Sequence, residues 1–141
     1  MVNLNKYVGE IKEFVQFSIN NFKSENEKPN SIGIYCCPWS GWISTNFNIA
    51  KNLNDTDNNC PDFEYVEFNL MDLPEWQNEY ETDNPKFKLN SSILVHNHDF
   101  GDEYFNKFIF EYLKSIVLEL KDNYEFDFLL QMLDSSLAEK L

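Results

Sequence analysis

The sequence predicts a single α+β domain, residues 1–141, in which helices pack on an antiparallel sheet of about four or more strands. A β-hairpin signal runs over residues 31–48, and segments with apolar residues three or four positions apart lie near both ends of the chain. The 141 residues are 43% hydrophobic and 16% aromatic, which is enough for one hydrophobic core.

Residues 4–23 are predicted to form an N-terminal amphipathic helix. Its apolar face is made by Leu4, Tyr7, Val8, Ile11, Phe14, Val15 and Phe22. In the hairpin that follows, Pro38 and Gly41 fit the first central and last positions of a turn. The alternation predicts that Ile32, Ile34 and Cys36 share one face of the first strand, and that Ile43, Thr45 and Phe47 share one face of the second.

The middle of the chain predicts two further strands and a short helix. Residues 62–69 carry the aromatic and β-branched residues of a third strand, and residues 73–81 form a helix with Asp72 as its N-cap. We expect a loop over residues 82–90. The continuous apolar run 92–96 predicts a central strand that is buried on both faces.

Two C-terminal helices complete the prediction. Residues 104–121 have the widest apolar face in the chain, with Asp102 or Asp99 as the cap. The second helix follows from the spacing of Phe126, Leu129, Leu130, Leu133 and Leu137.

The charge of the chain is strongly acidic and excludes several classes of partner. The formal net charge is −13, from 24 acidic residues against 11 basic ones, and every basic residue is lysine. Arginine is the usual reader of phosphate and guanine, so nucleic-acid binding is not expected. An anionic membrane surface would repel the chain, whereas a basic protein would be attracted to it.

The chain is expected to be cytoplasmic. It has no apolar run of the length that a membrane span needs, and its N-terminus lacks the basic-then-apolar order of a secretory signal. The three cysteines are an odd number, which suits a reducing compartment better than a disulfide framework. Cys36 and Cys37 are adjacent, so on a strand they point to opposite faces and do not form a dithiol redox site.

The segment His96-Asn97-His98-Asp99 is the best metal-binding candidate. Two histidines one residue apart on a strand point the same way, and imidazole with carboxylate suits zinc or iron. A hydrolase built on His96, His98 and Asp99 or Asp102 would need a third ligand from elsewhere, and the chain has no other histidine. The alternative interpretation is a strand end followed by a helix whose first turn is rich in acids.

No other arrangement in the sequence indicates catalysis. Both histidines lie in one short segment, no Gly-x-Ser-x-Gly nucleophile elbow occurs, and the four glycines are not clustered as in a phosphate-binding loop. We therefore expect neither catalytic residues nor a cofactor.

Tryptophan residues suggest a protein-binding surface. Trp39 lies at the predicted turn, where a large ring is rarely needed for folding, and tryptophan is enriched at interface hot spots. The alternative is that the ring is part of the core, as we expect for Trp76. The predicted partner-binding residues are Trp39, Trp42, Asp99, Asp102 and Glu103.

Three short segments resemble bacterial immunity proteins. These are Ile-Gly-Ile-Tyr at residues 32–35, Trp-Ile-Ser-Thr-Asn at residues 42–46 and Leu-Pro-Glu-Trp at residues 73–76. Their order after an N-terminal helix is similar to that of families whose genes lie beside polymorphic toxins. The resemblance covers residues 4–120 and implies a cytoplasmic protein that binds and blocks a cognate toxin, with no catalytic residue to carry over.

The favoured hypothesis is therefore a non-enzymatic domain that binds a protein, such as a basic toxin, and covers its active site. The alternatives are the metal-dependent hydrolase and a domain whose exposed aromatic residues form a homo-oligomer.

Overall fold

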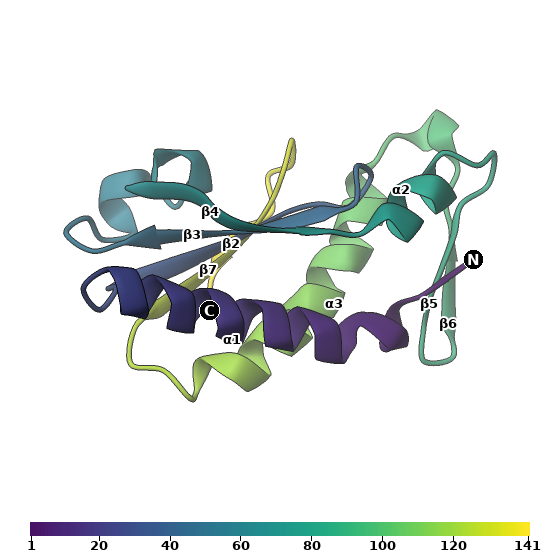
Figure 1. The fold of residues 1–141 in the computed structure, drawn as a ribbon. Coiled ribbons are helices and arrows are strands. Elements are labelled where there is room, and N and C mark those ends of the chain that lie inside the picture. The colour runs from purple at the N-terminus through teal and green to yellow at the C-terminus, as the bar shows by residue number, and fades with distance from the viewer.

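A computed structural model describes residues 1–141 as two sheets with three α-helices (Figure 1). The larger sheet has the strand order β4-β3-β2-β7-β8, and the smaller one has the order β1-β5-β6. The helices are α1 (Val8–Glu25), α2 (Pro74–Tyr80) and α3 (Glu103–Lys121). The strands are β1 (Val2–Asn3), β2 (Ser31–Cys37), β3 (Trp42–Asn48), β4 (Tyr65–Asp72), β5 (Lys86–Leu89), β6 (Ser92–Val95), β7 (Asp127–Met132) and β8 (Ala138–Lys140).

The α+β class is confirmed, and so are the hairpin and most helices. The strands β2 and β3 pair antiparallel around the turn at residues 38–41, with the predicted alternation of faces. The amphipathic segments 4–23 and 104–121 correspond to α1, with a short 3-10 turn before it, and to α3. The predicted helix 73–81 is α2, although Leu73 rather than Asp72 occupies its N-cap.

The prediction of a second C-terminal helix is wrong, because residues 127–132 form strand β7, which runs parallel to β2. Phe128, Leu130 and Met132 face the main core, and Leu129 faces a small cluster on the other side of the sheet. A strand that is buried on both faces reads as a continuous apolar run, and such a run also satisfies a helical spacing. The sheets are therefore mixed, since β1 also runs parallel to β5.

The prediction that residues 92–96 form a central strand buried on both faces is also wrong. Strand β6 lies at the edge of the smaller sheet rather than at its centre, and it pairs with β5 (86–89), a strand that the sequence analysis treated as loop. Only Leu94 of β6 is buried, while Ile93 and Val95 are exposed. The apolar run therefore does not mark a central strand here, and its exposure needs another explanation.

The main core lies between the larger sheet and the helices α1 and α3. On α1 it includes Ile11, Val15, Ile19 and Phe22. The ring of Phe22 stacks on that of Phe47 in β3, with centroids 4.2 Å apart. Figure 1 shows the smaller sheet at the end of the molecule beyond α2, away from β7 and β8. The helix α2 therefore lies between the two sheets (Figure 1). No helix has the length and apolar character of a membrane span.

Candidate protein-binding surface

Four large apolar side chains are exposed at the end of the molecule that carries the smaller sheet. Phe100 is 85% exposed, Tyr104 73%, Val95 55% and Ile93 53%. Val95, Phe100 and Tyr104 line one hollow of about 270 Å³, and Ile93 lies two residues before Val95 on the same side of β6. We call these four residues the Phe100 patch. Contiguous exposed apolar surface of this kind marks interaction sites.

A short ordered turn presents Phe100 to solvent. It is the 3-10 turn η4 (His98–Phe100), which is capped by the Asn97 side chain: the Asp99 N–H donates to Asn97 Oδ1 at 2.9 Å. The turn ends at Gly101, which has a φ of 75°. A side chain at that φ is disfavoured, so glycine lets the chain leave the turn directly into α3.

A half-buried hydrogen-bonded cluster connects this turn to the rest of the fold. Asp102 Oδ1 accepts a hydrogen bond from the Tyr80 hydroxyl at 2.5 Å and lies 3.1 Å from His96 Nε2. His96 is almost fully buried and stacks on the Tyr80 ring at 5.6 Å. Burial, and then the neighbouring Asp102 carboxylate, raise the pKa of Tyr80 above its ordinary value, so its hydroxyl stays a donor at neutral pH.

The candidate metal ligands do not come together as a group of three in this cluster. His98 Nε2 lies 2.8 Å from the Thr82 carbonyl oxygen, and the two histidine rings meet edge to face. No three His, Cys, Asp or Glu side chains come together in a group suited to a metal ion. The structure therefore gives no support to a site built on His96, His98 and Asp99, and both imidazoles are explained by hydrogen bonds within the fold.

The predicted tryptophan residues separate into different places. Trp39 is half-buried against the main core, and Trp76 is fully buried, as expected. Trp42 lies on the other face of the larger sheet, 5.7 Å from Tyr35 between ring centroids. It lines a hollow of about 240 Å³ that shares no residue with the Phe100 patch. Trp42 and Phe100 thus line different hollows, and Trp39 lines neither of them.

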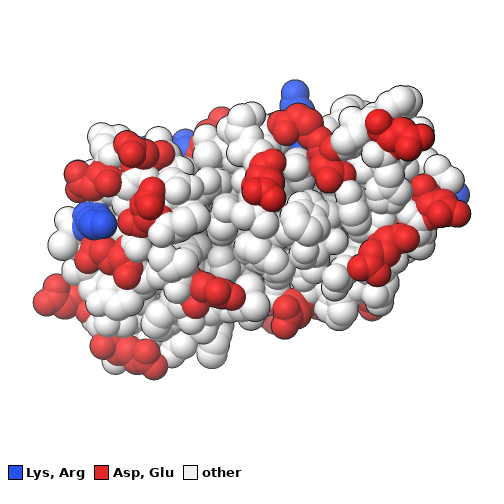
Figure 2. Space-filling model, turned by 90° about the horizontal axis from the view of Figure 1, so that it is seen from above, with Lys and Arg blue, Asp and Glu red and all other residues white.

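The predicted acidic residues Asp99, Asp102 and Glu103 adjoin Phe100 and Tyr104 in the chain, but their side chains differ in hydrogen bonding and exposure. Asp102 is held by Tyr80 and His96, and its side chain does not cap α3. The Glu103 carboxylate accepts a weak hydrogen bond from Ser135 Oγ at 3.4 Å. Asp99 is exposed directly beside Phe100. Figure 2 shows that acidic side chains are spread over one whole face and greatly outnumber basic ones there.

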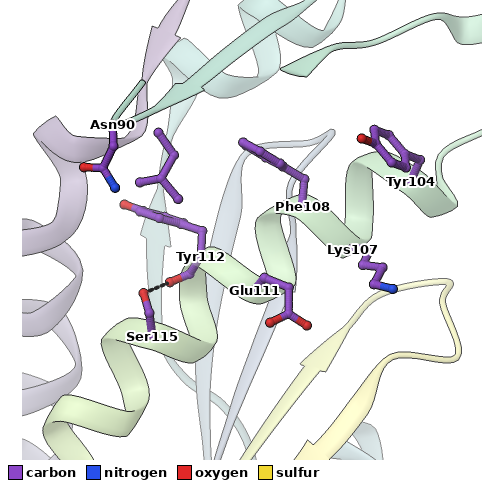
Figure 3. Close-up of a pocket in the computed structure, with 8 residues that line it drawn as sticks. Asn90, Tyr104, Lys107, Phe108, Glu111, Tyr112 and Ser115 are labelled. Atoms are coloured by element: carbon purple, nitrogen blue, oxygen red, sulfur yellow. Dashed lines mark hydrogen bonds between the residues drawn. The ribbon is translucent and has the colours of Figure 1, made fainter. Parts of the chain in front are cut away.

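A larger hollow of about 450 Å³ continues from the Phe100 patch along α3. Figure 3 shows the rings of Tyr104, Phe108 and Tyr112 following one another along the helix, with Asn90 across from Tyr112. Leu89, Lys107, Glu111 and Ser115 complete the lining. Tyr104 lines both hollows, so the apolar surface is continuous from Phe100 to the tip of the β5–β6 hairpin.

The sequence analysis missed all four residues of the Phe100 patch. One signal was present, because Phe100 stands between Asp99 and Gly101 in a segment that is otherwise polar. A large aromatic residue in a polar turn has no apolar partner in its own element and is rarely needed for folding, and the same holds for Trp39. The exposure of Ile93 and Val95 had no such signal, because only the sheet order decides it.

The cysteines are buried and unpaired. Burial raises the pKa of the Cys36 and Cys60 thiols well above the ordinary value, and it also raises the pKa of the Cys37 thiol. A buried thiol with a raised pKa is inert, so these residues act as small apolar side chains.

Because Trp39 is half-buried against the main core, its replacement by alanine should lower the stability of the fold. Trp39→Ala removes a ring that packs on the main core, so we expect a loss of about 2 kcal/mol in the free energy of unfolding, or roughly 5–8 °C in Tm. Thermal unfolding followed by circular dichroism measures this. A Tm within about 1 °C of the wild type would instead mean that the ring is a free surface anchor.

Comparisons with known proteins give no relative for this chain. No protein-family model, no curated protein and no solved structure matches it. The functional argument therefore depends on the residues and geometry described above.

Proposed function

We propose that this chain is a non-enzymatic protein-binding domain that docks its partner on the Phe100 patch. The observation that carries the proposal is the exposure of Phe100 on the capped turn η4 and of Tyr104 in the first turn of α3. Exposed aromatic rings cost free energy in water, and aromatic anchors dominate protein interfaces. The half-buried cluster of Tyr80, His96 and Asp102 supports the proposal because it holds this surface in place before the partner arrives.

Charge favours a basic partner. A net charge of −13 attracts a positively charged protein over a distance set by the ionic strength, and it speeds their encounter. The resemblance to immunity proteins gives this partner a concrete form, a basic toxin whose active site the domain covers. The hydrolase alternative has no specific observation in its favour, since both histidines are engaged by groups of the fold.

The test compares two variants that lose exposed aromatic surface. The double variant Phe100→Ala/Tyr104→Ala removes the centre of the patch, whereas Phe17→Ala removes a ring on α1 that is 63% exposed and lines none of the hollows. Both variants should keep the wild-type Tm because none of the three rings is buried. A partner retained from cell extract by the wild type and Phe17→Ala should be lost with the double variant.

The purified partner then provides the quantitative measurement. We expect its Kd to rise about 30-fold or more in the double variant, which is the effect of losing one hot spot of about 2 kcal/mol. The association rate should fall as salt rises, because the attraction is screened. An unchanged Kd in the double variant would show that the partner binds elsewhere, with the Trp42 hollow as the next candidate.

A further inference from the structure

The four edge strands of the two sheets differ in how they are protected. Natural edges are blunted by extreme shortness, by charged side chains, by proline or by bulges. Strand β1 has two residues, β8 carries Glu139 and Lys140, and β4 has a register shift with Glu67 at a φ of 51°. Strand β6, Ser-Ile-Leu-Val, has four residues and none of the other devices. It is therefore the one edge left open to pairing.

The hydrogen-bond pattern shows which groups of β6 face its free side. The His96 N–H donates to the Pro85 carbonyl at 2.8 Å, so His96 belongs to a hydrogen-bonded pair with β5. Such pairs alternate along an antiparallel ladder. With Lys86 opposite Val95 and Lys88 opposite Ile93, the N–H and C=O groups of Ile93 and Val95 point away from β5. They form a row of unpaired backbone groups within the Phe100 patch itself.

The two hollows flank this open edge. The hollow of about 450 Å³ begins at Leu89 and Asn90, just before β6, and the hollow of about 270 Å³ includes Val95, at its end. Both reach Tyr104 on α3. A strand added beside β6 would therefore place one set of alternate side chains beside Ile93 and Val95, and the other set beside Leu94 on the face of the sheet that carries Leu89.

We propose that β6 binds an extended segment of the partner as an added strand, with apolar residues at its centre and lysine or arginine at its ends. This inference rests on the proposed function and specifies its binding mode. Four residues of strand span about 13 Å, which sets the length of the apolar centre. Glu111 lines the larger hollow and Asp99 directly precedes Phe100, whereas Lys86 and Lys88 of β5 stand opposite Val95 and Ile93, so positive charge suits the ends of the added segment and not its centre. The net charge of −13 disfavours a second copy of this chain as the occupant.

The probe is a displayed library of random peptides of about nine residues, selected on the whole protein and counter-selected on Phe100→Ala/Tyr104→Ala. Two variants of one residue separate backbone from side-chain effects. Ile93→Pro removes the N–H that faces the free edge, a position where proline is tolerated, whereas Ile93→Thr keeps that N–H and the branched side chain. Both should fold, because the ladder with β5 does not use this N–H.

We expect the selected peptides to carry β-branched or aromatic centres with basic ends. Ile93→Pro should weaken their binding about ten-fold or more, and Ile93→Thr by less than about three-fold. Bound peptide should slow amide hydrogen exchange at Ile93 and Val95, and replacing its basic ends by glutamate should weaken binding.

The contrary results fall into separate classes. Peptides that need Phe100 and Tyr104 but tolerate Ile93→Pro would overturn strand addition and leave the proposed function in place. A selection that yields no peptide sensitive to Phe100→Ala/Tyr104→Ala would overturn both. Protection of the Ile93 and Val95 amides in the protein alone, together with a dimeric mass, would show that a second copy occupies the edge and would overturn the basic segment.

Discussion

Trp76→Ala is expected to lower the free energy of unfolding by about 3–5 kcal/mol, the cost of emptying the site of a large core ring. Trp76 is the largest fully buried side chain, and its indole contacts the Tyr7 ring edge to face at 5.7 Å. It also packs against Phe87 of the smaller sheet and Tyr112 of α3. Because no other residue of α2 is buried, its loss would loosen the joint between the two sheets.

Denaturant unfolding measures this effect, with two matched substitutions as controls. Trp76→Phe keeps an aromatic ring and removes the indole N–H, which is buried without a hydrogen-bond partner, so it should cost much less than alanine. Phe17→Ala should leave the midpoint unchanged, since its ring is exposed. A loss below about 1 kcal/mol for Trp76→Ala would contradict the packing described here.

Gly41→Ala is expected to cost about 2–4 kcal/mol, for two reasons that act together. Gly41 has a φ of 70°, where a side chain is strained. A Cβ there would also lie 2.3 Å from the Leu73 carbonyl oxygen, which belongs to the backbone. The chain cannot move away cheaply, because Leu73 N–H donates to the Gly41 carbonyl at 2.7 Å.

Other glycines of the chain provide the controls for Gly41. Gly101 has a φ of 75° and a ψ of −175°, a backbone conformation that is essentially restricted to glycine, and nothing lies within 4 Å of its Cβ position, so Gly101→Ala should show backbone strain alone, about 1–3 kcal/mol. Gly9 lies in α1 with open space, and Gly9→Ala should raise stability by about 0.5–1 kcal/mol. If Gly41→Ala cost no more than Gly101→Ala, the contact with Leu73 would not be tight.

Trp76→Ala and Gly41→Ala should both disturb the Phe100 patch, because both act on α2. This helix begins after Leu73 and ends at Tyr80, whose hydroxyl holds Asp102 and whose ring supports His96. A loosened α2 would therefore release the turn that presents Phe100. We expect partner binding to weaken in the folded fraction of Trp76→Ala, although residue 76 is buried and away from the partner.

The local sequence was sufficient to predict those elements whose residue pattern lies within a single segment. The hairpin 31–48 follows from alternation on both sides of Pro38 and Gly41, and α1 and α3 follow from apolar spacing that only a helix brings to one face. The acidic charge is a property of composition and needed no structure.

The tertiary structure alone decided the roles of the remaining apolar runs. The runs at 92–95 and 127–132 look alike in sequence, yet the first is an exposed edge and the second is buried on both faces. Spacing within a run shows how its residues alternate, but the neighbours of a strand come from distant segments. The candidate binding surface depends on this order, because β6 is open only where no further strand follows it, and Tyr104 of α3 is placed beside it by packing.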